Sequence, residues 1–180
     1  MSADGAVVYW EAAQGADVYS LDIGKDEFFS VYVGGYDDRG VSSLAESVVG
    51  LEPGTNYWAK IASENESGIS GYSDAITFLT LPQAPTIDFN FVEQQSVTLY
   101  WEDVNSAIRY EVEAKHGDVV EVYSFNVGEE GVVDGLLEAT DYRFRVRAQN
   151  TAGFSEYSSQ VSIMTVSGTP QNLLISNLDQ

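Results

Sequence analysis

The chain has a single histidine, His116, and no cysteine, so few of its residues could carry out group-transfer chemistry. A Ser-His-Asp arrangement needs a histidine beside its nucleophile, and a histidine-built metal centre needs several ligands in one place. His116 follows an expected strand and precedes Gly117, which is typical of a solvated turn. The sequence therefore excludes thiol catalysis and cysteine-ligated metal, and it offers no histidine cluster.

Carboxylates are the other residues that could do chemistry, and several stand in close pairs. General acid–base catalysis needs a carboxyl group in a desolvated pocket, whereas these pairs fall in expected loops and turns. No Asp-x-Asp-x-Asp spacing is present, although calcium held between loop carboxylates stays open. We therefore predict no enzyme and no other cofactor. The pairs are Asp26-Glu27, Asp37-Asp38, Glu64/Glu66 and Glu129-Glu130.

The charge balance narrows the choice of partners. The chain carries 28 acidic and eight basic residues, for a net charge of −20. Such a chain repels phosphate backbones and anionic membrane surfaces, so we expect no nucleic-acid partner. No apolar run approaches the roughly 20 residues of a spanning helix, so we expect no membrane insertion. Solubility explains the charge most simply, and exposure to high salt or calcium is the alternative.

The segments that position these residues have the sequence pattern of β-strands. Apolar residues alternate with polar ones in most segments, Gly, Asn, Asp and Pro punctuate the gaps, and no window has the 3.6-residue period of a helix. We predict an all-β chain built from β-sandwiches. The alternating segments include Ala6–Trp10, Tyr19–Ile23, Ser96–Trp101, Tyr110–Ala114 and 142–148.

The chain also repeats itself. The segment 65–73, Asn-Glu-Ser-Gly-Ile-Ser-Gly-Tyr-Ser, returns as Asn-Thr-Ala-Gly-Phe-Ser-Glu-Tyr-Ser 85 positions later (65 to 150). We therefore predict two domains, 1–81 and 82–167, followed by a tail at 168–180. The junction carries two prolines, Pro82 and Pro85, which restrict the backbone and favour a semi-rigid, extended pair.

The repeated residues resemble those of the fibronectin type III family. They are Trp10, Leu51-x-Pro-Gly-Thr-x-Tyr57, Asn65 and Gly68-x-Ser70-x-x-Ser73 in the first copy, and Trp101, Leu136, Thr140, Tyr142, Asn150, Gly153, Ser155 and Ser158 in the second. The second copy departs by having Glu138-Ala139 in place of Pro53-Gly54. The resemblance covers nearly the whole chain and implies two immunoglobulin-like sandwiches in tandem; this fold hosts many roles.

The resemblance also assigns core positions. It implies that Trp10 and Trp101 lie between the sheets and supply the largest buried area of each core. It implies that Tyr57 and Tyr142 form tyrosine corners, each with its hydroxyl bonded to backbone a few residues upstream. Leu51 and Leu136 join the core list in the same way.

Two outward-facing features could mark a ligand site. Arg143, Arg145 and Arg147 share one face of a strand, which suggests an anion site. The family fold pairs that strand with the one holding Glu111 and Glu113, so cross-strand ion pairs are the simpler explanation.

Trp58 is the second outward-facing feature. It is out of phase with its inward neighbours, and Arg143 takes its place in the second copy. The fold does not require it, so it could contact a partner protein, a sugar ring or a neighbouring module.

The ends of the chain stand out against the repeat. The first copy lacks the segment that begins at Pro85 in the second, so we expect its first strand, strand A, to be missing. A segment of that type opens at Pro170, and Leu173 and Ile175 alternate as Ile87 and Phe89 do. We predict that residues 170–180 of one chain fill the vacant position in the next, joining copies head to tail. A fragment with arbitrary ends is the alternative.

Together these features favour a non-catalytic structural or adhesion module pair, extracellular or at the cell surface, and of microbial type. Neighbouring copies or modules of the same protein are its expected partners. The alternative function is a protein- or carbohydrate-binding accessory pair belonging to a larger secreted enzyme or receptor.

Overall fold

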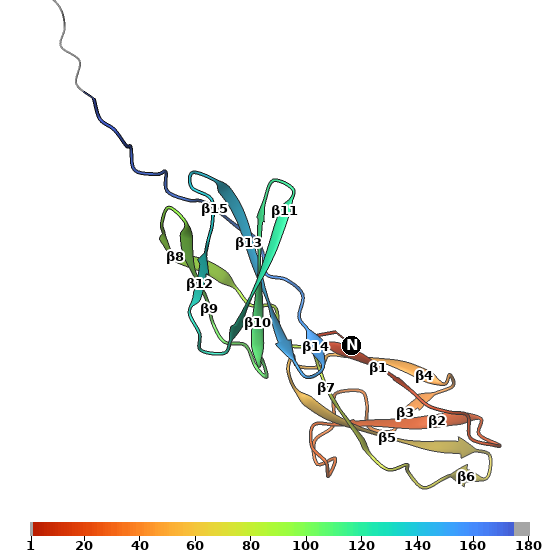
Figure 1. Cartoon of the computed structure of the whole chain (residues 1–180). Helices are drawn as coiled ribbons and strands as arrows, with labels where there is room; N and C mark the ends of the chain where they lie inside the picture. Colours follow the sequence, from red (N-terminus) through yellow and green to blue (C-terminus); the bar gives the residue numbers. More distant parts are fainter. Residues whose placement is uncertain (1, 175–180) are drawn as a thin grey trace, which may run out of the picture.

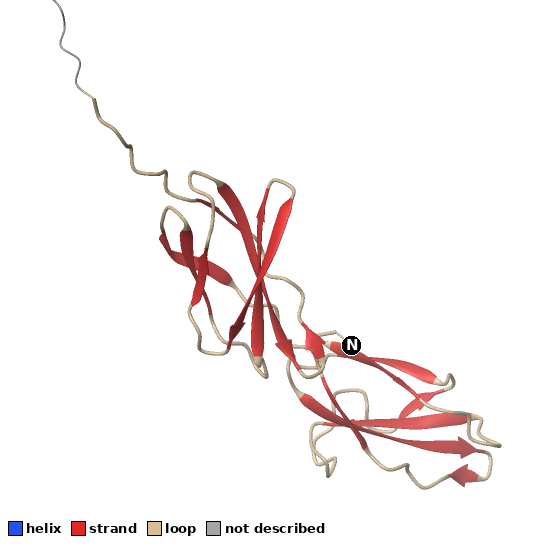
Figure 2. Cartoon of the chain, in the orientation of Figure 1, coloured by secondary structure: helices blue, strands red, loops and turns tan. Residues whose placement is uncertain are grey.

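The computed structural model describes residues 2–174, and within them the chain consists of strands, turns and loops with no helix (Figure 2). The first seven strands form one sandwich, module one, and the other eight form a second, module two. The two modules lie end to end, and the described tail leaves module two at the end opposite module one (Figure 1). The prediction of an all-β chain with two sandwiches in tandem is confirmed.

Module one packs a two-stranded sheet against a larger one. The larger sheet has the order β3-β2-β5-β6 with β7 also paired to β5, and the small sheet pairs β1 with β4. The strands are β1 (Gly5–Tyr9), β2 (Val18–Gly24), β3 (Arg39–Val41), β4 (Ala45–Val49), β5 (Asn56–Asn65), β6 (Gly68–Ile69) and β7 (Ile76–Leu79).

Module two repeats this plan with one strand more in its smaller sheet. That sheet has the order β12-β9-β8, and the larger has β11-β10-β13-β14 with β15 also paired to β13. Among residues 2–174, β8 therefore has no counterpart in module one, as the sequence predicts. The strands are β8 (Ile87–Val92), β9 (Ser96–Trp101), β10 (Arg109–His116), β11 (Val119–Asn126), β12 (Gly131–Asp134), β13 (Asp141–Asn150), β14 (Gly153–Phe154) and β15 (Val161–Met164).

Each sandwich buries its own apolar core, and alternation along the strands places most of it, although β2 is buried on both faces. In β13, Tyr142, Phe144 and Val146 are buried while the arginines between them face outward. Leu51 and Leu136 are buried at equivalent positions of the two modules. The core of each module therefore draws on the period-two pattern of its own strands.

The two tyrosine corners are formed. The Tyr57 hydroxyl accepts a hydrogen bond from the Glu52 backbone N–H at 2.7 Å, and the Tyr142 hydroxyl accepts one from Leu137 at 3.0 Å. Each ring is buried, and each hydroxyl satisfies a backbone donor that would otherwise lack a partner. These bonds hold the loop before each long strand against its core.

The two tryptophans pack against the cores of their modules. Trp10 and Trp101 are half-buried, and tyrosines and one phenylalanine are the largest side chains buried completely. Trp101 is the last residue of β9 and Trp10 follows the last residue of β1, so each ring reaches the rim of its sandwich. Trp101 packs 5.3 Å from the ring of Tyr110, and Trp10 packs 5.6 Å from Tyr19, measured between centroids.

Buried polar contacts join the modules. The Asn150 amide donates to the Thr80 carbonyl at 2.9 Å, and the Asn105 amide donates to the Gly54 carbonyl at 3.0 Å. Gly54 has a positive φ of 59°, and a Cβ there would lie 2.4 Å from the Asn105 carbonyl oxygen. The joint therefore requires glycine at position 54, both for its backbone conformation and for its close contact with module two.

Candidate functional site

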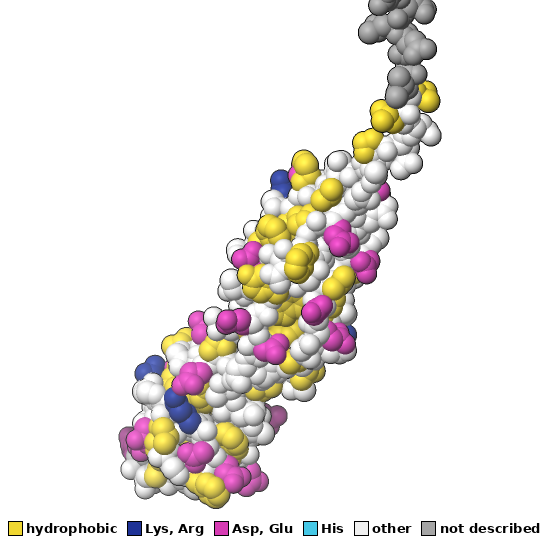
Figure 3. Space-filling view, turned by 90° about the vertical axis from the view of Figure 1, so that its left-hand side faces the viewer, with side chains coloured by type: hydrophobic (Ala, Val, Ile, Leu, Met, Phe, Trp, Pro, Cys, Tyr) yellow, Lys and Arg dark blue, Asp and Glu magenta, His cyan; other side chains and the backbone are white. Residues whose placement is uncertain are grey.

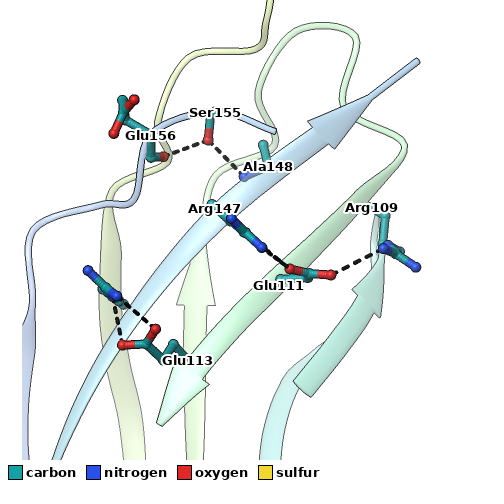
Figure 4. Close-up of polar contacts among 8 residues, drawn as sticks. Arg109, Glu111, Glu113, Arg147, Ala148, Ser155 and Glu156 are labelled. Atoms are coloured by element: carbon teal, nitrogen blue, oxygen red, sulfur yellow. Dashed lines mark hydrogen bonds and ion pairs between the residues drawn. The ribbon is translucent and has the colours of Figure 1, made fainter. Parts of the chain in front are cut away.

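The arginine row of module two forms a ladder of ion pairs. Arg145 lies opposite Glu113 in the β10–β13 register and donates two hydrogen bonds to it, at 2.8 and 2.7 Å. Arg147 pairs in the same way with Glu111, which also accepts from Arg109 (Figure 4). The Glu113 carboxylate raises the pKa of Arg145, because their hydrogen bonds favour the charged guanidinium.

Aromatic rings cover the same arginines from the other side. The Arg145 guanidinium lies 4.0 Å from the centroid of the Tyr157 ring, and that of Arg147 lies 4.0 Å from Phe154. The hydroxyl oxygens of Ser155 and Ser158 accept hydrogen bonds from the backbone of β13 and hold this segment in place. The guanidinium groups of Arg145 and Arg147 are therefore already engaged, which favours the structural explanation over an anion site.

Module one has the counterpart of this ladder on its own outer face. Lys60 lies between the rings of Phe29 and Tyr72, 4.3 and 4.2 Å from their centroids, and pairs with the buried Asp22 at 3.2 Å. The Tyr72 hydroxyl donates a hydrogen bond to Asp38, and burial raises the pKa of this Tyr72 hydroxyl. Sequence reasoning missed this cluster because Phe29 belongs to an expected loop, although its apolar neighbours were a signal that the loop packs.

Trp58 stands on the same face, next to this cluster. Its cross-strand neighbours are Gly24 on β2 and Thr77 on β7, and its ring is half-buried. A contact between Trp58 and a partner stays a proposal.

The remaining residues singled out in the sequence serve local structure. Backbone N–H groups of Ser30, Phe28 and Val31 bond to the Asp26 carboxylate and lower its pKa. The His116 ring lies 4.9 Å from that of Tyr142. Among residues 2–174, no group of three or more His, Cys, Asp or Glu side chains could hold a metal ion.

Acidic side chains are scattered over both modules on the face shown in Figure 3. They do not gather into one patch on that face. In the part of the chain that the structure describes, no helix is long and apolar enough to cross a membrane.

A groove opens along β1 of module one and is the strongest candidate site. It has a volume of about 200 Å³, and both sheets of the module line it: Val8, Tyr9 and Trp10 at β1 of the small sheet, and Leu21, Ala59, Lys60, Ile61 and Ile76 of the larger one, with Ser73 and Asp74 from the segment before β7. Tyr9 is 80% exposed beside it. The outer edge of β1 pairs with no strand among residues 2–174, so backbone donors and acceptors are free along the groove.

Module two shows how the equivalent position is filled. There β8 pairs with β9, placing Ile87 opposite Trp101 and Phe89 opposite Leu99. Ile87 is 4% exposed, and the Val166 N–H donates to the Glu93 carbonyl at 2.9 Å just beyond the ends of β15 and β8. In module one, no strand among residues 2–174 takes the place beside β1 that β8 has beside β9.

One further atom in the groove lacks a partner. The indole Nε1 of Trp10 is buried and makes no hydrogen bond within the described chain. A buried donor without an acceptor costs about 1–3 kcal/mol.

The tail contacts module two where it begins, since the Gln94 amide donates a hydrogen bond to the Thr169 hydroxyl at 3.1 Å. Leu173 and Leu174 are 95% and 87% exposed, and residues 170–174 form no strand. Figure 3 shows hydrophobic side chains standing clear of module two along this segment. Ile175 and the rest of the predicted donor segment lie outside the described residues.

Known proteins resemble this chain in both sequence and fold. Residues 82–164 match the family model described as "Fibronectin type III domain". The chain is 26% identical to human "Fibronectin type-III domain-containing protein 3A", in an alignment covering 91% of this chain and 15% of that protein. It is 29% identical to chicken "Protein sidekick-2", covering 73% of this chain and 7% of that protein. The chain thus spans a small part of the length of these relatives.

A solved structure extends the resemblance to both modules. The "two fibronectin type-III domain segment from chicken tenascin" superposes with a TM-score of 0.54 at 18% identity, covering 91% of this chain and 94% of that one. At this identity the likeness shows the fold, a tandem of fibronectin type III sandwiches. The relatives named here come from animals, so the expectation of a microbial type is not supported.

Proposed function

We propose that this chain is a non-catalytic structural or adhesion module pair, extracellular or at the cell surface, whose module one binds an extended strand in its groove. The observation that carries the proposal is the free edge of β1 beside that apolar groove. Main-chain hydrogen bonds to such an edge supply affinity, and pockets for alternate side chains supply specificity.

The chemistry of the occupant follows from β8 of module two. That strand begins two residues after Pro85, runs antiparallel to β9 and buries Ile87 in the core. A segment that binds the groove should likewise be extended, carry alternate apolar side chains and have no charge on its inner face.

The tail supplies a segment of this chemistry. Pro170 opens it as Pro85 opens β8, and Leu173 and Ile175 provide the alternate apolar residues. The tail leaves module two at the end far from module one (Figure 1), so it cannot reach its own groove. We therefore infer that residues 170–180 of one copy occupy module one of the next, a heterologous link that propagates into a filament.

A peptide of residues 170–180 tests the groove directly. Added to the chain with residues 169–180 deleted, it should raise the melting temperature of module one and protect the amides of Gly5–Tyr9 from hydrogen exchange. A peptide with Asp at positions 173 and 175 is the matched control and should do neither.

Mass measurements test the assembly. The full chain should form an open-ended series of species whose mass grows as its concentration rises, and the truncated chain should form no such series with or without the peptide. An unchanged melting temperature on adding the peptide would show that residues 170–180 do not bind module one and would overturn assembly through the tail.

A second candidate is a protein- or carbohydrate-binding accessory pair, and the half-buried Trp58 on the outer face favours it. An indole at a surface can stack on a sugar ring or anchor a protein contact. A glycan array and a pull-down with the wild type and with Trp58→Arg, which copies Arg143 of module two, separate the two candidates. Loss of a ligand in the variant supports binding at Trp58, and equal profiles exclude it.

A further inference from the structure

The strand β11 is an unprotected edge of module two. It ends the sheet order β11-β10-β13, and no strand among residues 2–174 pairs with its outer side. It runs for eight residues in unbroken register with β10, from Asn126 opposite Arg109 to Val119 opposite His116. It contains no proline, no lysine and no bulge, and Glu121 is its single charged residue.

Natural sheets usually blunt such edges with short strands, charges, bulges or covering loops. Module one does so at the equivalent place. Its β3 is three residues long and begins with Arg39, and the segment 25–38 folds back along the rest of β2. Val33 donates its N–H to the Ile23 carbonyl, and Ile23 donates to Tyr36, so the edge of β2 is hydrogen-bonded.

β11 also presents apolar side chains to solvent. Tyr123 and Phe125 pack toward the core, which directs Val120 and Val122 to the outer face. Val122 is 55% exposed, and Val120 beside it is also exposed. A long edge in unbroken register, with exposed valines, is a template for another strand.

We propose that β11 pairs antiparallel with β11 of a second copy, with Val122 opposite Val122, to form a closed dimer about a two-fold axis. The charge of Glu121 disfavours the register next to this one. Centring the pair on residue 121 would place Glu121 opposite itself, and like charges directly opposite are destabilising.

In the proposed register, Glu121 faces Tyr123 of the partner subunit, and Val120 faces the partner's Ser124. Tyr123 already donates to Glu121 of its own strand at 2.9 Å, so these groups are compatible neighbours. The valines of the two strands then form one apolar row on the outer face of a continuous sheet.

Salt should strengthen this dimer. The chain carries a net charge of −20, so two copies repel each other through their overall field. No like charges are opposed within the pairing itself, and raising the ionic strength therefore screens repulsion without breaking a contact. The dissociation constant should fall several-fold between about 0.05 and about 0.5 M salt.

Sedimentation velocity of the full chain tests the proposal. Val122→Lys and Val122→Glu should each lose the dimer, because each places like charges opposite at the two-fold axis. An equimolar mixture of the two variants should regain it, since lysine then faces glutamate. Val132→Lys, at an exposed valine on β12, is the matched control and should dimerise like the wild type.

The mixture separates edge pairing from the head-to-tail link through the tail. Edge pairing gives a species of twice the chain mass, and substitution of Val122 should abolish it. The head-to-tail link gives assemblies of growing mass, and substitution of Val122 should leave them unchanged. Melting curves of both variants establish that they fold. A wild type that stays monomeric at both salt concentrations, variants that still dimerise, or a mixture that stays monomeric would each overturn the proposal.

Discussion

Module one and module two are copies of one repeat, but the equivalent strands β1 and β9 have different neighbours in their sheets. In module two, β9 lies between β8 and β12, and Val97 and Leu99 are completely buried. In module one, the equivalent β1 is an edge strand paired on one side, and Val8 at the position of Leu99 is half-buried beside the groove. The presence of β8 therefore accounts for the deeper burial of this strand in module two.

In the larger sheets it is module two that has the free strand edge. Module one covers its β2 edge with the short β3 and the folded segment 25–38, while module two leaves the eight-residue β11 free. The place beside β1 is thus open in module one where β8 fills it in module two, and the strand beside β2 is short in module one where its counterpart β11 is long in module two. Fold membership does not determine which surface of a module is available for contacts, because short differences between the repeats decide it.

The largest expected effect comes from the same substitution made in the two strands. Val97→Ala should destabilise module two by about 2–3 kcal/mol, because it removes two buried methyl groups and leaves a closed cavity. Val8→Ala should cost module one about 1 kcal/mol or less, because the groove already admits solvent. Urea denaturation followed by hydrogen exchange resolves each module. Equal losses would mean that the groove is closed in solution.

The repeated asparagine gives the next contrast. Asn150→Ala should cost about 2 kcal/mol, because buried partners of its amide at the joint lose their hydrogen bonds. Asn65→Ala, at the free end of module one, should cost less than about 1 kcal/mol because the site is exposed. Thermal melts of the two variants provide the comparison. A loss at Asn65 as large as that at Asn150 would show that the joint adds nothing.

The smallest effect is expected at the ladder. Arg145→Gln should cost less than about 1 kcal/mol, since the Arg145–Glu113 pair is partly exposed to solvent. Any binding activity of the chain should survive the substitution. Urea titration measures the loss of stability, and a pull-down with any partner found measures the binding activity. Complete loss of a partner would make the row a ligand site after all.

The sequence predicted much of the fold because the fold follows local patterns. Alternation placed Tyr57 and Tyr142 inward, repeat spacing separated two modules, and cross-strand pairing anticipated the partners of Arg145 and Arg147. These features depend on the two-residue period of strands and on contacts between neighbouring strands, and both can be recognised in short stretches of sequence.

Other features depend on how loops and strand ends pack, which periodicity does not encode. The burial of Phe29 and the cation–ring stack at Lys60 come from a loop folding over a sheet. The half-burial of Trp101 comes from its place at the rim of the sandwich, which strand periodicity alone does not reveal. That β1 and β11 are edge strands can be recognised only once the order of strands in each sheet is known.

The joint also determines how tension would pass along the molecule. The Leu81 N–H donates to the Ser2 carbonyl at 3.2 Å, so both ends of module one lie together at the joint (Figure 1). A pull between residue 2 and the tail would therefore load the joint and module two and would gain no reach from the length of module one. A strand bound antiparallel to β1 would enter at the far end of module one and leave at the joint. Only then would force cross the whole module, with the ladder of hydrogen bonds along β1 loaded in shear.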